Sequence, residues 1–174
     1  MTEMNLLERA LVATEAHSGQ TDKAGELHIL HSLRLMASMP TEAEQASALL
    51  HDVAEDCELW SVARITDEFG SEVGQAVDAL TKRDGEDYDE YLTRLEANPI
   101  AVKVKLADLT DNNDTSRLKH TTERDKERLR KYQLAIARLM KPTSRWWGSV
   151  PSTIIPIGTL HPIIRPDLDS SFVG

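Results

Sequence analysis

The sequence predicts an all-α domain, and three observations support this prediction. Apolar residues recur at three- and four-residue spacing through residues 1–141, and the alternation that is typical of strands is absent there. Glycine and proline stand almost only at the joints between these periodic segments. The chain has 174 residues, of which 40% are hydrophobic, and this is enough for one compact domain.

The ends of the expected helices are marked by residues that start or stop helices. Pro40 and Gly70 end helices, and Pro99 begins one, because proline fits the first helical turn and disrupts the interior. Thr41 is expected to cap a helix, with Glu44 three residues later as its capping-box partner. The expected helices run from Leu6 to near Gly19, over 27–36, from Thr41 through Val53, up to Phe69, over 73–80, over 88–95, over 99–109 and over about 121–141.

The composition changes at Pro142. Five of the seven prolines and two of the three tryptophans lie in residues 142–174. Segments such as 153–156 and 161–164 cannot be helix interiors, because each contains a proline. We therefore expect a domain over 1–141, followed by an irregular, proline-rich C-terminal tail over 142–174 that is extended or disordered.

Charge and cysteine content exclude several classes of protein. The chain has 20 Lys and Arg against 29 Asp and Glu, a formal net charge of −9, which argues against binding to nucleic acid. No stretch approaches the roughly 18 apolar residues of a membrane span. Cys57 is the single cysteine, so no internal disulfide can form and a reducing cytoplasm is expected. The oligomeric state stays open.

The segment His51-Asp52-Val53-Ala54-Glu55-Asp56 is the most informative part of the sequence for chemistry. On a continuous helix, His51 and Glu55 lie one turn apart, as do Asp52 and Asp56. The preceding apolar run directs these groups inward, where unpaired charges are costly, and a divalent cation would remove that cost. The alternative is a solvated acidic helix end.

Two further segments carry groups of the same kind. His31 lies on an apolar helix face, one turn after His28, and Asp108 interrupts an apolar helix with Asn112 one turn later. Imidazoles combined with carboxylates suit Mn²⁺, Fe²⁺ or Zn²⁺ better than calcium. The residues therefore predict a transition-metal site.

The order of His31, His51-Asp52 and Asp108 resembles the signature of the HD superfamily of metal-dependent phosphohydrolases. Further segments resemble the hydrolase domain of RelA/SpoT-type proteins in family order, namely 16–20, 23–26, 48–56, 69–70, 80–82 and 105–108. A single domain of this length is similar to the small alarmone hydrolases. The resemblance implies an HD-domain helical bundle that cleaves the 3′-pyrophosphate of (p)ppGpp, a small nucleotide substrate, using Mn²⁺.

The resemblance also implies roles for individual residues. The metal ligands would be His31, His51, Asp52 and Asp108. Glu55 and Asp56 would position and activate the attacking water or protonate the leaving group, because carboxylates outside the metal's own ligands can accept a proton from metal-bound water. The substrate-binding residues would be Lys23, in a basic loop, and Asn112.

Several positions beside the substrate depart from the family pattern. Asp22 replaces a basic residue expected at the guanine, and Leu109 replaces an arginine after Asp108. His28 stands where a tyrosine is usual, and Ser32 where a proline is usual. Two alternatives therefore stay open: hydrolysis of another nucleotide, and a non-catalytic nucleotide-binding regulatory module. The carboxylates of Glu55 and Asp56 argue against the second alternative.

Overall fold

The computed structural model describes residues 5–14, 19–21, 25, 27–114 and 122–141. These residues form a helical bundle without a named strand, and an isolated antiparallel bridge joins Thr21 to Leu27. The expected all-α class is confirmed. The helices are α1 (Leu6–Ala13), α2 (His28–Ala37), α3 (Glu42–Leu50), α4 (Val53–Asp56), α5 (Val62–Phe69), α6 (Ser71–Leu80), α7 (Tyr88–Leu95), α8 (Pro99–Asn113) and α9 (Glu123–Leu139).

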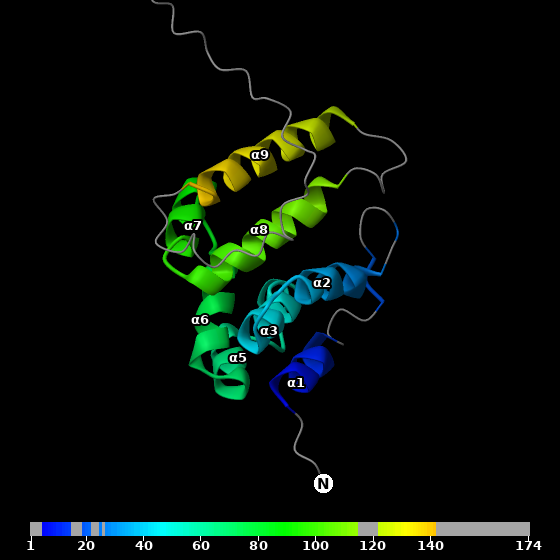
Figure 1. The fold of residues 1–174 in the computed structure, drawn as a ribbon, viewed down its shortest axis with the longest axis vertical. Coiled ribbons are helices and arrows are strands. Elements are labelled where there is room, and N and C mark those ends of the chain that lie inside the picture. The colour runs from blue at the N-terminus through cyan, green and yellow to red at the C-terminus, as the bar shows by residue number, and fades with distance from the viewer. Residues whose placement is uncertain (1–4, 15–18, 22–24, 26, 115–121, 142–174) are drawn as a thin grey trace, which may run out of the picture.

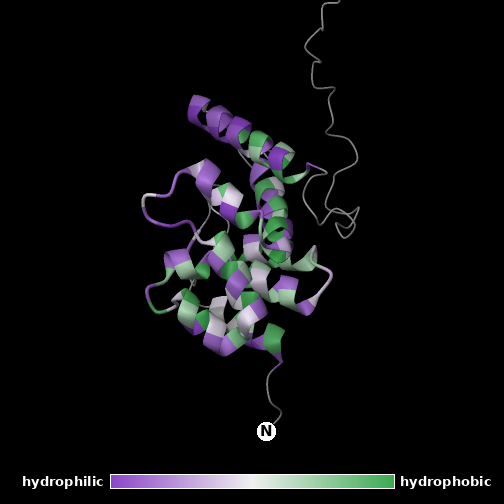
Figure 2. Ribbon diagram, turned by 90° about the vertical axis from the view of Figure 1, so that its left-hand side faces the viewer, coloured by the Kyte–Doolittle hydropathy of each residue, from purple (hydrophilic) through white to green (hydrophobic). Residues whose placement is uncertain are grey.

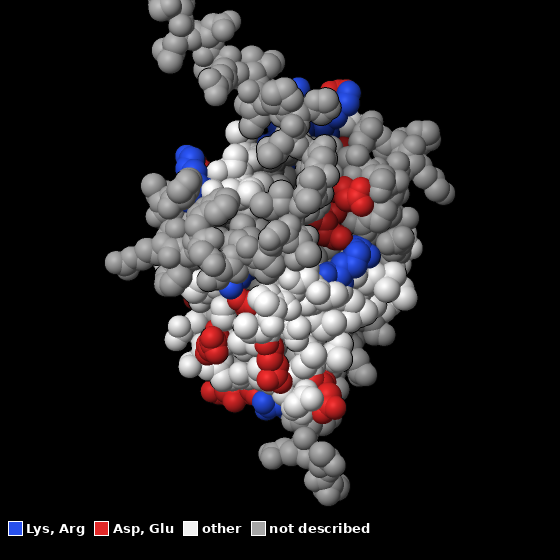
Figure 3. All heavy atoms as spheres, in the orientation of Figure 1, with Lys and Arg blue, Asp and Glu red and all other residues white. Residues whose placement is uncertain are grey.

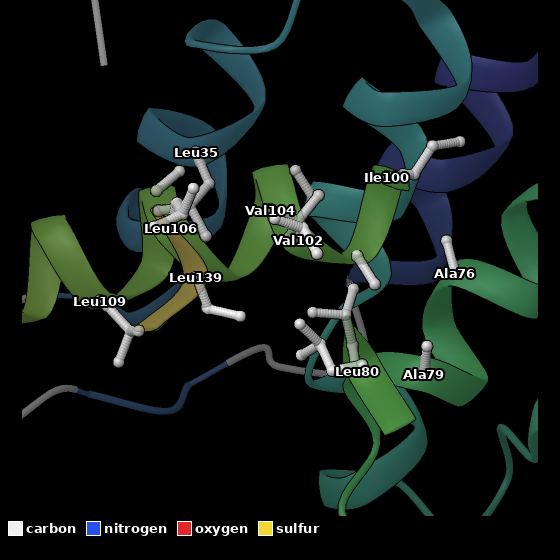
Figure 4. Close-up of a cluster of buried hydrophobic side chains, with 14 of the residues drawn as sticks. Leu35, Ala76, Ala79, Leu80, Ile100, Val102, Val104, Leu106, Leu109 and Leu139 are labelled. Carbon is white, nitrogen blue, oxygen red and sulfur yellow. The ribbon is translucent and has the colours of Figure 1, made fainter. Parts of the chain in front are cut away.

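Helix α8 runs through the middle of the bundle, with α9 along one side and α2 along the other (Figure 1). Its buried residues include Val104, Asp108 and Leu109, so an aspartate lies within an otherwise apolar helix surface. Figure 4 shows Leu35 of α2 beside Leu106 of α8, whereas side chains of α6 lie toward the Ile100 end. This packing aligns α2 with the part of α8 that carries Asp108.

A second hydrophobic cluster joins α1, α3, α5 and α6. Leu49 and Leu50, at the end of α3, are fully buried in it, and so is Val53 at the start of α4. Burying side chains of this size contributes roughly 1.5–3 kcal/mol each. The apolar residues on both sides of His51 and Asp52 therefore anchor the segment that carries them.

The predicted helix ends are largely confirmed. Thr41 and Glu44 form a capping box at the start of α3, Pro99 occupies the first turn of α8, and α5 ends at Gly70. Gly70 has φ 88°, a left-handed value that favours glycine because it has no Cβ. The predicted extension of the first helix to Gly19 falls partly on residues that the structure does not describe.

The prediction of one continuous helix through His51-Asp52 is wrong. Helix α3 ends at Leu50, and α4 begins at Val53 after a two-residue turn. Asp52 has φ −100° and ψ −10°, and its carbonyl accepts hydrogen bonds from the backbone N–H groups of Glu55 and Asp56. Helix α4 therefore starts its own series of backbone hydrogen bonds at Asp52.

The N-terminal half of α9 is mostly hydrophilic, as Figure 2 shows. The buried residues of this helix are Ala135 and Leu139, both in its C-terminal half. Lys126 pairs with Glu123 at 2.7 Å and Arg128 with Asp125 at 3.3 Å. In Figure 3, acidic side chains predominate at the end of the molecule where α1 and α5 lie. Within the described ranges, no helix has the length and hydropathy that crossing a membrane requires. The tail predicted over 142–174 lies outside the described residues.

Candidate metal and active site

Three segments that are far apart in the sequence bring their polar side chains to one place. His31 comes from α2, His51 from the turn after α3, and Asp108 from α8, and all three are buried. One ligand atom from each lies within 4.8 Å of the others. The structure therefore gathers three of the four predicted metal ligands, and Asp52 adjoins them.

His51 is held in one orientation by the backbone. Its Nδ1–H donates a hydrogen bond to the carbonyl of Ala48 at 2.9 Å, so its Nε2 carries the lone pair in the neutral ring. Nε2 is buried and has no hydrogen-bond partner among the described residues, although Oδ2 of Asp52 lies 3.0 Å away. A buried nitrogen of this kind is suited to bind a metal ion.

His31 is held by carboxylates on both ring nitrogens. Its Nε2 lies 3.2 Å from Oδ1 of Asp108, and its Nδ1 lies 2.7 Å from Oδ2 of Asp111. Arg34 in turn donates two hydrogen bonds to the carboxylate of Asp111, at 2.7 and 3.0 Å. A carboxylate behind a histidine fixes its tautomer and orientation, as is usual for histidines that bind metals.

Asp108 receives hydrogen bonds from its own helix. Lys105 donates to Oδ2 at 2.8 Å, and the side-chain amide of Asn112 donates to Oδ1 at 2.5 Å. Two side chains of α8 therefore orient the carboxylate of Asp108, and its Oδ1 also lies 3.2 Å from Nε2 of His31.

Burial and charge act in opposite directions on the pKa values of these groups. Burial by itself would lower the pKa of His31, but hydrogen bonds to Asp108 and Asp111 raise it to about 9. Burial would raise the pKa of Asp108, and the charge of Lys105 together with the hydrogen bond to His31 holds it below its ordinary value. A metal that binds Nε2 of His31 must therefore displace a proton.

The chemistry of this donor set fits a divalent transition metal. Two imidazoles and two carboxylates form a mixed nitrogen and oxygen set of the kind that suits Mn²⁺, Fe²⁺ or Zn²⁺. The buried Nε2 of His51, which lies 3.0 Å from Oδ2 of Asp52, supports that fit. His31, His51, Asp52 and Asp108 would hold such an ion.

Glu55 and Asp56 are exposed at the outer edge of the site, on α4. Oε1 of Glu55 accepts a hydrogen bond from the backbone N–H of Lys82 at 2.6 Å, which ties α4 to the chain after α6. Asp56 belongs to a second group of possible ligands, together with His28 and Asp52.

Of the two predicted substrate-binding residues, the structure describes Asn112 but not Lys23. Asn112 is exposed and its amide contacts Asp108, so the structure ties it to a candidate metal ligand. Lys23 and Asp22 lie outside the described residues. The roles of these residues stay predictions.

Sequence reasoning missed Asp111, Arg34 and Lys105. Lys105 and Asp111 each stand three residues from Asp108 on α8, a spacing that places side chains on neighbouring parts of a helix surface. That spacing was the available signal. The pairing of Arg34 with Asp111 joins residues 77 positions apart and left no such sign.

No family model matches the chain. A guanosine-3′,5′-bis(diphosphate) 3′-pyrophosphohydrolase of Vibrio cholerae is 33% identical over 117 residues, which cover 59% of this chain and 16% of that protein. The bifunctional (p)ppGpp synthase/hydrolase SpoT of Escherichia coli is 31% identical over 117 residues, again 59% of this chain and 16% of the relative. The chain thus spans about a sixth of the length of these curated relatives.

A solved structure of a metazoan orthologue of SpoT, described as hydrolysing ppGpp, superposes with a TM-score of 0.65 at 21% identity. The match covers 83% of this chain and 90% of that one. The described residues form an all-helical domain with clustered histidines and aspartates, and its fold is similar to that of this SpoT orthologue. The chain is related in sequence to the RelA/SpoT-type hydrolases, as its motifs indicate.

Proposed function

We propose that the chain is a metal-dependent phosphohydrolase that removes the 3′-pyrophosphate from guanosine-3′,5′-bis(diphosphate). The observation that carries this proposal is the convergence of His31, His51 and Asp108, whose ligand atoms lie within 4.8 Å of one another. Each histidine has its Nδ1 engaged and its Nε2 turned toward a carboxylate. The names of the relatives supply the substrate.

The proposed cofactor is Mn²⁺, held by His31, His51, Asp52 and Asp108. A divalent cation, when bound, lowers the pKa of a coordinated water and so supplies a nucleophile near neutral pH. The donor set supports a transition metal, and the choice of Mn²⁺ follows from the resemblance to the alarmone hydrolases.

Glu55 and Asp56 are proposed as the acid and base groups. Water attacks phosphorus, the bond between that phosphorus and the 3′-oxygen breaks, and the 3′-oxygen takes up a proton. The products are guanosine diphosphate and pyrophosphate. Both carboxylates are exposed to an incoming substrate, and the backbone N–H of Lys82 orients Glu55.

Substrate binding is assigned to Lys23 and Asn112 by the same resemblance. Asn112 lies on the last turn of α8, next to the candidate metal ligand Asp108. We also propose the cytoplasm as the location, because the single Cys57 fits a reducing compartment.

A second candidate function is hydrolysis of a different nucleotide by the same metal chemistry. Asp22 and Leu109 are the observation that favours it, because both stand where the family has positively charged residues beside the substrate. An acidic or neutral residue there weakens attraction for a multiply charged nucleotide.

The test is a panel of nucleotides assayed with Mn²⁺, in which pyrophosphate release is separated from orthophosphate release. We expect ppGpp to yield pyrophosphate, and His51→Ala to abolish the reaction. Cleavage of another nucleotide without cleavage of ppGpp would favour the second candidate. No cleavage of any nucleotide by a chain that binds Mn²⁺ would favour a non-catalytic binding module.

A further inference from the structure

A second group of possible metal ligands adjoins the first. One ligand atom each from His28, Asp52 and Asp56 lies within 4.8 Å of the others. Oδ2 of Asp52 is 3.5 Å from Nε2 of His28 and 3.0 Å from Nε2 of His51. One carboxylate oxygen therefore stands between a histidine of each group.

Local structure sets the second group in place. His28 is the first residue of α2, and its backbone N–H donates to the carbonyl of Gln20 at 2.9 Å, which fixes the start of the helix. Its ring centroid is 5.9 Å from that of His31, one turn later. Asp52 and Asp56 stand at the two ends of α4, and the backbone N–H of Asp56 donates to the carbonyl of Asp52 at 2.9 Å.

The two groups differ in exposure. His31, His51 and Asp108 are buried, whereas His28 and Asp52 are half-buried and Asp56 is exposed. The second group is therefore the outer one of the two. One imidazole and two carboxylates suit a divalent transition metal and leave positions for water or phosphate oxygens.

The charge of the site gives a reason for a second cation. Five carboxylates lie in or beside the two groups, those of Asp52, Glu55, Asp56, Asp108 and Asp111, and two of them are paired, Asp108 with Lys105 and Asp111 with Arg34. A single divalent cation offsets only part of this charge, and a pyrophosphate group brings more negative charge. A second cation would stabilise the phosphate oxygens that such a site otherwise repels.

We propose that His28, Asp52 and Asp56 bind a second divalent cation, and that Asp52 bridges it to the cation held by His31, His51 and Asp108. With Asp56 bound to that cation, the acid and base role proposed above would rest on Glu55. The inference rests on the proposed function, because it assigns a second metal to the same site. His28 and Asp56 belong to this group alone, whereas Asp52 also lies 3.0 Å from His51 of the first group.

The test counts bound metal and does not depend on activity. The full chain is saturated with Mn²⁺, and its metal content is measured by native mass spectrometry, while electron paramagnetic resonance reports coupling between ions. We expect two Mn²⁺ per chain with a coupled signal in the wild type. His28→Tyr and Asp56→Asn should each bind one, with the spectrum of an isolated ion.

Glu58→Gln is the matched control, because Glu58 is an exposed carboxylate two residues beyond Asp56 and outside both groups. It should bind two Mn²⁺, as the wild type does. Asp56→Asn changes an exposed side chain, so it keeps the test decisive if His28→Tyr fails to fold. Circular dichroism checks the fold of each variant.

One Mn²⁺ per wild-type chain, or two in both His28→Tyr and Asp56→Asn, would overturn the second site. Both results leave the buried site and the proposed function in place. A chain that binds no Mn²⁺ at all would overturn this inference together with the metal site of the proposed function.

Discussion

Oδ2 of Asp111 lies 2.7 Å from Nδ1 of His31, and the same carboxylate is held by Arg34 through two hydrogen bonds. The three residues form a chain of contacts that runs from the half-buried Arg34 to the buried imidazole. Nε2 of His31 is thereby directed toward Asp108, at 3.2 Å. A predicted metal ligand thus owes its orientation to a residue outside the metal-binding motif.

Replacing Asp111 should weaken metal binding without removing a ligand. Asp111→Asn keeps an acceptor for Nδ1 of His31 but removes the charge that strengthens the histidine as a donor to metal. We expect the Kd for Mn²⁺ to rise about 10–100-fold, the usual effect of losing such a partner. Calorimetric titration measures it, with Asp67→Asn on the exposed face of α5 as the control. An unchanged Kd would assign Asp111 a purely structural role.

Metal binding should raise the melting temperature. The predicted ligands come from α2, the turn after α3, and α8, so one ion ties together three separate segments. At a free Mn²⁺ concentration of about 100 times Kd, the gain in stability is about 2.7 kcal/mol. Thermal melts with Mn²⁺ and with chelator measure the shift. His51→Ala should show a smaller shift than the wild type, and a wild type insensitive to both would argue against the ligand assignment.

Glu55→Gln should separate catalysis from metal binding. The amide oxygen of glutamine can still accept the hydrogen bond from Lys82, so the local geometry is kept while the proton-accepting charge is lost. We expect turnover to fall about 10²–10⁴-fold, the range for a positioned acid or base. Metal content should not change. Loss of the buried metal would make Glu55 a ligand, and full activity would remove it from the mechanism; Glu58→Gln serves as the control.

Asp22→Arg tests the substrate. A basic side chain at this position should attract the anionic nucleotide and so lower the KM for ppGpp. The metal chemistry is untouched, and kcat should stay nearly constant. Steady-state kinetics on the two proteins measure both constants. If the wild type cleaves another nucleotide and this variant still fails to cleave ppGpp, the second candidate function is correct.

Acid should weaken the ion pair between Glu86 and Arg94. Hydrogen bonds from Arg94 and from the backbone of Arg83 lower the pKa of Glu86 from 4.5 to about 2. A lowered pKa stabilises the fold above pH 4.5, and this contribution is lost as the pH falls from 4.5 toward 2. Glu86→Gln should therefore lower the urea midpoint at pH 6 and match the wild type near pH 2. An equal difference at both pH values would contradict the pKa.

Local signals in the sequence were sufficient for most of the helical framework. The capping box of Thr41 and Glu44, the proline that opens α8 and the glycine that ends α5 act over a few residues, so they could be recognised without a fold. Residues that favour a helix lie on both sides of His51 and Asp52. For this reason the sequence led to the wrong prediction of one continuous helix through them. His51 and Asp52 themselves form a two-residue turn, and Leu50 before it and Val53 after it are both buried in the second hydrophobic cluster.

The sequence by itself determined the helical class, the residue types of the candidate metal site and the relationship to RelA/SpoT-type hydrolases, because each of these is carried by local order and spacing. The tertiary structure alone decided that Asp111 holds His31 and that Asp52 lies between His28 and His51. His31 and Asp111 are 80 residues apart, and their contact exists only because α2 packs along α8. Contacts of this kind depend on how helices pack, and helix packing depends on the whole apolar surface rather than on any one motif.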